Sequence, residues 1–215
     1  MISNGIMNRL RDETRPQHEH AESRPFEQAL AAGRLPRELY VENLGQRLCM
    51  HKVLEAPLRQ LVARDPRLAD LVLDEQYQTP NLHADLAFFG IDAAVVRPRA
   101  ATAALVREIE AAADQEPLAL LGFFYVFEGS KNGAHFLAKR LRAAYQLEQN
   151  GLRYFDPHGD QQRPLWHAFK ARMDLVPLTP AEADAIVAAA RATFQRVAEV
   201  EDEIYYERMG AAPAA

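Results

Sequence analysis

The chain of 215 residues contains a single cysteine, Cys49, so it cannot form an intramolecular disulfide and fits a reducing compartment. It has no run of about 18 apolar residues, the length that a membrane-spanning helix needs, and residues 1–20 lack the apolar core of a signal peptide. Its 25 basic and 30 acidic residues give a formal net charge of −5, so the chain lacks the excess of basic residues that is typical of nucleic-acid-binding proteins. These absences predict a cytoplasmic protein that has neither nucleic acid nor a membrane as a partner.

Strand signals are also scarce, because no segment alternates convincingly between apolar and polar residues and no hairpin dipeptide joins two such segments. Helical periodicity is present instead. Apolar residues recur at steps of three to four through residues 35–64 and 98–113, and an apolar pattern spans residues 117–147. Thr179 and Glu182 form a capping box that opens a last helix. The sequence therefore predicts an all-α protein.

Hydrophobic residues make up 48% of the chain, which is enough for a core that encloses a sizeable ligand. We expect one domain over residues 1–215, with a disordered tail at about 210–215. Proline and glycine place the expected loops around Pro66, around Thr79-Pro80 and from 156 to 160.

The most unusual stretch is residues 129–134, Gly-Ser-Lys-Asn-Gly-Ala, which interrupts the pattern of the central apolar helix. Each glycine inside a helix costs about 0.5–1 kcal/mol relative to alanine. Such a cost is tolerated where another group approaches bare backbone. The one-turn spacing of Gly129 and Gly133 suits either a neighbouring helix or a flat ligand.

A second unusual segment lies near the N-terminus, where His18 precedes Glu22 by one helical turn. On a helix the two side chains share a face, and a carboxylate there can orient an imidazole that binds a metal through its other nitrogen. Pro16 either kinks a helix that begins near Ile6 or lies in the first turn of a helix capped by Thr14. The alternative interpretation of His18 is an exposed histidine on a charged amphipathic helix.

Together these segments resemble the heme oxygenases, particularly the bacterial ones. Residues 10–22 match the family's proximal-helix pattern, Leu-Arg-x-x-Thr-Arg-x-x-His-x-x-x-Glu, and residues 121–130 are similar to the approach to its distal helix. Residues 151–170 and the segment that leads into the last helix follow in the family's order. The resemblance implies an all-helical fold that holds heme between proximal and distal helices. It also implies oxidation of heme, as cofactor and substrate, to biliverdin, carbon monoxide and ferrous iron.

The resemblance implies a role for individual residues. His18 would bind the heme iron with Glu22 beside it, Arg11 and Lys170 would pair with the heme propionates, and Phe194 would wall the pocket. The implied catalytic residues lie on the distal side, where backbone approaches the porphyrin and molecular oxygen: Gly129, Ser130, Gly133 and Ala134.

Departures from the family's pattern leave a second function open. The distal acidic residue of the animal enzymes is absent and Ser130 lies nearby, while Ala134 stands where a second glycine is common. A distal His135 could compete for the sixth iron position and favour an oxygen-inert state. The alternative function is therefore a heme-binding or heme-sequestering protein of the same fold without turnover.

The resemblance also implies an electron donor, such as a ferredoxin or a flavodoxin reductase system. Residues 139–142, Lys-Arg-Leu-Arg, are typical of a solvated helix face and would also suit an acidic donor. Cys49 and His51 do not face each other on a helix, so we interpret Cys49 as an ordinary buried or half-buried thiol. No Glu-x-x-His spacing occurs, which argues against a di-iron carboxylate oxidase.

Overall fold

The computed structural model describes residues 5–210, and within them the chain forms eight α-helices, four single-turn 3-10 helices and no strand. The predicted all-α class is therefore confirmed. The tail expected at about 210–215 lies outside the described residues, apart from Gly210. The α-helices are α1 (Ile6–Glu22), α2 (Pro25–Ala31), α3 (Arg37–Arg64), α4 (Thr79–Phe88), α5 (Ala100–Gln115), α6 (Leu120–Tyr145), α7 (Gln162–Leu175) and α8 (Pro180–Met209). The 3-10 helices are η1 (Pro66–Leu68), η2 (Asp74–Gln76), η3 (Pro117–Ala119) and η4 (Gly159–Gln161).

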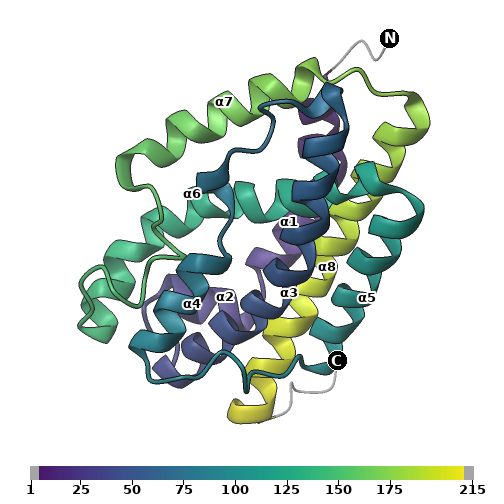
Figure 1. Ribbon diagram of the computed structural model, residues 1–215. Helices are drawn as coiled ribbons and strands as arrows, with labels where there is room; N and C mark the ends of the chain where they lie inside the picture. Colours follow the sequence, from purple (N-terminus) through teal and green to yellow (C-terminus); the bar gives the residue numbers. More distant parts are fainter. Residues whose placement is uncertain (1–4, 211–215) are drawn as a thin grey trace.

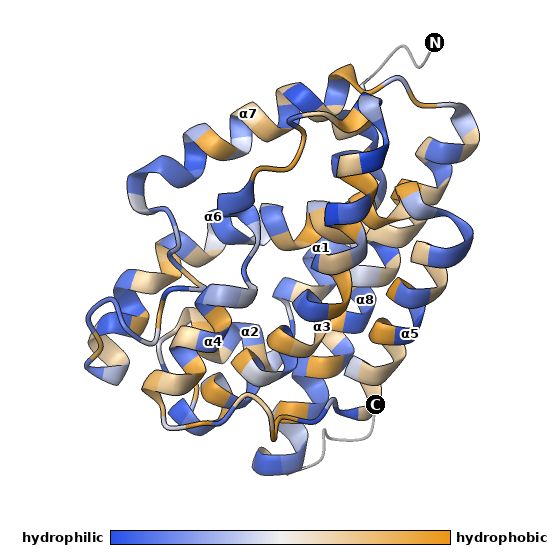
Figure 2. Ribbon diagram, in the orientation of Figure 1, coloured by the Kyte–Doolittle hydropathy of each residue, from blue (hydrophilic) through white to orange (hydrophobic). Residues whose placement is uncertain are grey.

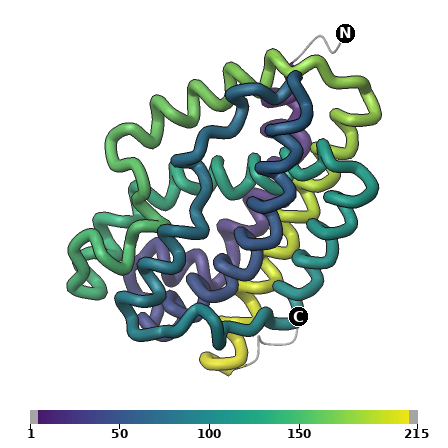
Figure 3. Tube along the Cα trace, in the orientation of Figure 1, coloured from purple at the N-terminus to yellow at the C-terminus, as the bar shows by residue number. Residues whose placement is uncertain are grey.

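The long helix α8 organises the molecule, since α1, α5 and α6 all pack along it (Figures 1 and 3). On another side α3 packs against α4 and α5, and α7 runs along one edge of the molecule. Apolar residues gather on the inward faces of the helices, while the outer turns of α7 are mostly hydrophilic (Figure 2). Large side chains from four different helices are fully buried at the centre: Phe26, Tyr40, Phe127 and Phe169.

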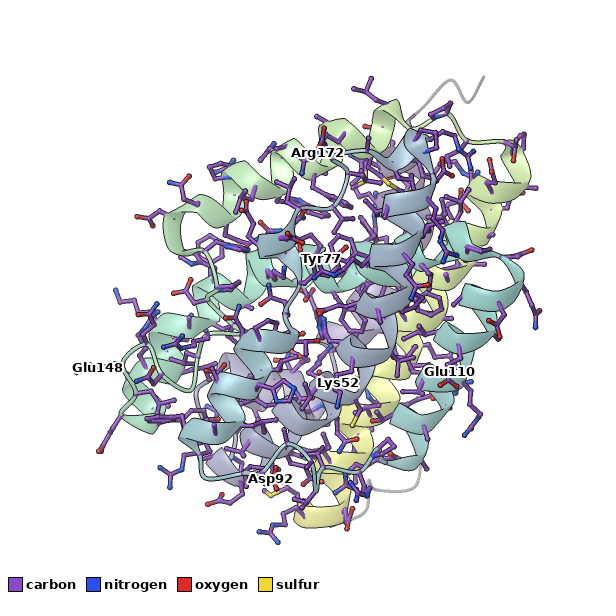
Figure 4. All side chains as sticks on the ribbon, in the orientation of Figure 1. Lys52, Tyr77, Asp92, Glu110, Glu148 and Arg172 are labelled. Carbon is purple, nitrogen blue, oxygen red and sulfur yellow. The ribbon has the colours of Figure 1, made fainter. Side chains whose placement is uncertain are left out.

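Side chains fill the space that the ribbons leave open between α7 and α3 (Figure 4). Tyr77, which is labelled there, is 6% exposed and packs under the guanidinium of Arg59, whose Cζ lies 4.0 Å from the ring centre. This part of the molecule is therefore core rather than an opening. None of the helices within residues 5–210 combines the length and the apolar character needed to cross a membrane.

The predicted start of the last helix is confirmed. The hydroxyl of Thr179 accepts a bond from the Glu182 amide over 3.3 Å, and the Glu182 carboxylate accepts one from the Thr179 amide over 2.7 Å. Further along, Gly122 of α6 lies directly against α8, because a Cβ at this position would be only 2.1 Å from the carbonyl oxygen of Ile186. This glycine lets the two helices pack closely and so fixes the position of α6.

The first helix begins at Ile6 and continues through Pro16, so the first of the two predicted alternatives is correct. Thr14 does not cap a helix. Its hydroxyl donates to the Leu10 carbonyl over 2.6 Å, inside the helix. The start of α1 is held by Asp174 of α7, whose carboxylate accepts a bond from the Met7 amide over 2.9 Å.

Two expectations about local structure are wrong. The central helix α6 is continuous through residues 129–134, where the hydroxyl of Ser130 and the amide of Asn132 donate to carbonyls one turn earlier. The expected loop at Thr79-Pro80 is instead the first turn of α4. Proline loses nothing in that turn because amides there have no intrahelical partner. The carboxylate of Glu55 accepts bonds from the free amides of Gln78 and Thr79.

Candidate functional site

A cleft of about 320 Å³ lies between α1 and α6, and it brings together residues that are far apart in the sequence. Its volume is within the range of about 300–1,000 Å³ typical of small-molecule sites. The cleft is lined by all of the predicted catalytic residues and by three of the predicted ligand-binding residues: Gly129, Ser130, Gly133, Ala134, His18, Glu22 and Phe194. A larger hollow of about 790 Å³ between α3 and residues 86–97 contains none of them.

His18 forms one wall of the cleft. Its Nδ1 lies 3.4 Å from a carboxylate oxygen of Glu22, one turn later on α1. The ring of Phe194 on α8 meets the imidazole edge to face, with 5.2 Å between ring centres and 70° between the planes. The imidazole is half-exposed, so a group entering the cleft can reach it. Glu22 and Phe194 thus lie beside an imidazole that is accessible from the cleft.

The opposite wall is the backbone of α6, and the two α6 glycines in the cleft lining, Gly129 and Gly133, differ. A Cβ at Gly133 would meet no atom within 4 Å, so bare backbone faces open space there. A Cβ at Gly129 would lie 3.3 Å from Cη2 of Trp166, so the lack of a side chain at this glycine mainly leaves room for the indole ring. The hydroxyl of Ser130 donates to the Phe127 carbonyl over 2.9 Å. Gly133 is therefore the position where a flat ligand can lie against the helix.

Between the two walls the lining is mixed, and apolar side chains cover much of it: Leu30, Val126, Leu137, Phe155 and Val197. The inner end is charged. Arg47 of α3 donates from Nη2 to the carboxylate of Glu201 of α8 over 2.6 Å, and Glu27 of α2 lines the same end. Glu201 is 1% exposed and Arg47 is 9% exposed. Burial raises the pKa of the Glu201 carboxyl well above its usual range, and the nearby Glu27 raises it further.

Sequence reasoning missed this charged end. One signal is present in the sequence, since Arg47, His51 and Glu55 follow each other at steps of four residues. That spacing places three polar side chains on one face of α3, between leucines, and the face is buried. The partners on α2 and α8 are distant in sequence and are brought there only by the fold.

A hydrogen-bonded chain continues from the cleft along this face of α3. The hydroxyl of Tyr154, which lines the cleft, lies 3.2 Å from Nε2 of His51, and Nδ1 of His51 lies 2.9 Å from the carboxylate of Glu55. Burial lowers the pKa of His51, although Glu55 opposes this shift. His51 is thus turned toward Glu55 and away from Cys49. Cys49 is half-buried, as predicted, and burial raises the pKa of its thiol.

The structure does not bring Arg11 and Lys170 to the wall of the cleft. Arg11 is paired with Asp12 over 2.9 Å at the surface, and Nζ of Lys170 lies 5.7 Å from the centre of the Trp166 ring. Trp166 in turn packs against Tyr125, with 5.8 Å between ring centres. Lys170 therefore lies beyond the indole that covers Gly129, and both basic side chains would have to extend to reach a ligand.

His135 is also outside the cleft lining. Its Nδ1 lies 2.7 Å from a carboxylate oxygen of Asp156, in the loop between α6 and α7. Burial acts to raise the pKa of Asp156, but hydrogen bonds from Arg142 and His135 outweigh it and lower the pKa. His135 is therefore paired with Asp156 and does not line the cleft.

Comparisons with known proteins identify the family and the fold of this chain. The family described as heme oxygenase matches residues 4–203. Heme oxygenase-1 of the cyanobacterium Synechocystis sp. PCC6803, solved in complex with heme, superposes with a TM-score of 0.87 at 21% identity, covering 96% of this chain and 95% of that one. Heme oxygenase-2 of the same organism, in complex with heme and NO, superposes with a TM-score of 0.86 at 24% identity, covering 96% of this chain and 89% of the other.

Other solved structures share the fold as well. The heme oxygenase of Leptospira interrogans gives a TM-score of 0.84 at 22% identity, covering 93% of this chain and all of that one. A TenA homologue of P. horikoshii gives 0.65 at 15% identity, covering 94% of this chain and 99% of that one. No curated protein sequence matches. The fold is thus that of the all-helical proteins shared by heme oxygenases and TenA proteins. Within that class the chain belongs to the heme oxygenase family.

Proposed function

We propose that this protein is a heme oxygenase, which cleaves heme oxidatively to biliverdin, carbon monoxide and ferrous iron. The observation that carries the proposal is the pairing of His18 with the open backbone of Gly133 across one cleft in a member of this family. Two structures of the same fold were solved with heme bound. The cleft suits a flat, largely apolar ligand because imidazole, bare backbone and aliphatic side chains form its walls.

The chain's own residues divide the binding of heme among them. His18 would bind the iron through Nε2, since Nδ1 faces Glu22, and Phe194 would support the imidazole from the side. Arg11 and Lys170 would pair with the propionates at the open edge after leaving their present surface contacts. Bound heme supplies the iron at which oxygen is activated, and its ring is the substrate that is cleaved.

The distal side would leave room for molecular oxygen. Gly133 places no side chain in the cleft, and the methyl group of Ala134 is the smallest substitution for glycine. An external donor, such as a ferredoxin or a flavodoxin reductase system, would supply the electrons. The alternative, heme binding without turnover, rests on the missing distal acidic residue, on Ala134 and on His135. Of these, His135 is paired with Asp156 and does not line the cleft.

The test is a titration of the purified protein with hemin, followed by addition of a reductant in air. We expect a Soret band on binding, then its decay with the appearance of a biliverdin spectrum. A stable low-spin spectrum that resists the reductant would contradict turnover. His18→Ala should lose the axial ligand, whereas His20→Ala should not, because His20 is exposed on the same helix and lines no part of this cleft.

A further inference from the structure

The charged inner end of the cleft is unusual because two carboxyl groups, those of Glu27 and Glu201, lie near the guanidinium of Arg47, which is hydrogen-bonded to Glu201. Arg47 Nη2 donates to Oε1 of Glu201, and the guanidinium also lies over the ring of Phe127, with Cζ 5.9 Å from the ring centre. Oε2 of Glu201 is buried and receives no hydrogen bond from any donor among the described residues. An ionised carboxylate left half-satisfied in the interior would be costly.

Glu27 explains how that oxygen is satisfied. Its carboxyl lines the same cleft as Glu201, and a hydrogen bond between the two carboxyls is among the influences on the pKa of each, yet two ionised carboxylates cannot donate to each other. One proton shared by the pair would supply the missing donor and leave the cluster with Arg47 electrically neutral. Two ionised carboxylates would instead leave an uncompensated negative charge beside the buried side chain of Glu201.

We propose that Glu27 and Glu201 share one proton at neutral pH and are the proton donor of this cleft, with Arg47 holding Glu201 in place. This proposal rests on the proposed function for its substrate and extends it to a proton source. In the step that we infer, an O–H bond of the shared acid breaks and an O–H bond forms at an oxygen acceptor in the cleft. The pair is left as two carboxylates beside Arg47, and water entering the cleft returns the proton.

The surroundings of the pair favour the protonated form. Burial is the main cause that raises the pKa of both carboxyls, and Arg47 is the main opposing charge. From α1, Glu22 raises the pKa of Glu27 and His18 lowers it. From the loop before α7, Tyr154 lines the same cleft as Arg47 and Glu201, and both charges act on the pKa of its hydroxyl. A ligand that fills the cleft would exclude more water, which strengthens the preference for a neutral acid.

Infrared spectroscopy of the protein without heme tests the shared proton directly. We expect the carbonyl stretch of a buried carboxylic acid at pH 7 in the unmodified protein, and loss of that component in both Glu27→Gln and Glu201→Gln. Either substitution leaves one carboxyl facing Arg47 alone, which favours its ionised form. Glu199→Gln is the matched control, because Glu199 lies on the same helix outside this cleft and pairs with Arg196. It should leave the spectrum unchanged.

Heme-loaded protein then tests proton donation. The two Gln variants should bind hemin as the unmodified protein does but form biliverdin about 100-fold more slowly or worse, the usual range for a lost general acid. The proposal is overturned if the infrared component is missing from the unmodified protein, survives both substitutions, or disappears without any effect on turnover. If the unmodified protein fails to bind or convert hemin, the proposed function fails, whereas the infrared result still reports on the acid pair.

Discussion

At the scale of single residues, two glycines of α6 perform opposite tasks. Gly122 is buried against α8, where an added methyl group would collide with the backbone of Ile186, whereas Gly133 faces open space. The sequence alone cannot separate these roles, because both glycines lie within one apolar helical pattern. The difference is made by the helix that packs against one of them.

Alanine at the two positions should therefore act in opposite directions. Gly133→Ala should stabilise the protein by about 0.5–1 kcal/mol through helix propensity, yet weaken hemin binding because the methyl group enters the cleft. Gly122→Ala should destabilise the protein by about 1–3 kcal/mol or more, since the backbone of α8 must move. Urea unfolding and hemin titration of both variants check this. Weakened stability in Gly133→Ala would mean that its space is not free.

At the scale of elements, the sequence predicts best those helices whose signals are local. The capping box of Thr179 and Glu182 and the leucine spacing of α3 depend on neighbouring residues alone, and both are confirmed. The short helices α2 and α4 were not predicted, because α2 has only 7 residues and the free amides at the start of α4 are satisfied by Glu55, from another helix.

The same distinction applies to the site. His18, Glu22 and Gly133 belong to two continuous segments, so their spacing was visible in the sequence. The charged inner end combines α2, α3 and α8, and no local pattern connects Glu27 to Glu201. Even the polar spacing of Arg47, His51 and Glu55 on α3 would suggest a solvated stripe, and only tertiary packing shows that it is buried.

The buried face of α3 should make the stability depend on pH. His51 is 3% exposed and its folded-state pKa lies below the ordinary value of about 6.5. As the pH falls below about 6.5, His51 is therefore protonated in the unfolded chain before it is protonated in the folded protein. The free energy of unfolding then falls by up to about 1.4 kcal/mol per pH unit, until the pH reaches the folded-state pKa of His51.

His51→Gln removes this titration while its amide can still donate to Glu55. We expect the variant to be less stable at pH 7 but to lose stability less steeply between about pH 6.5 and 5. Urea unfolding across that interval measures the slope. Carboxyl groups elsewhere are common to both proteins and cancel in the comparison. Parallel slopes for the two proteins would show that His51 titrates normally.

At the scale of the whole molecule, the cleft depends on three long helices rather than on one rigid wall. α1 carries the imidazole, α6 carries the bare backbone, and α8 packs against both and contributes Phe194 and Glu201. A ligand in the cleft would join α1 to α6, which otherwise meet mainly through α8. Binding there should slow the local opening of both helices.

Hydrogen exchange with and without hemin would locate the ligand. We expect added protection at residues 14–22 of α1 and 126–137 of α6, because their amides open less often when the ligand spans the cleft. The matched control is α5, residues 100–115, which contacts Arg196 and Glu203 of α8 and lines no part of the cleft. The larger hollow beside α3 offers the competing location. Protection confined to residues 86–97 would place the ligand there and would remove His18 from its proposed role.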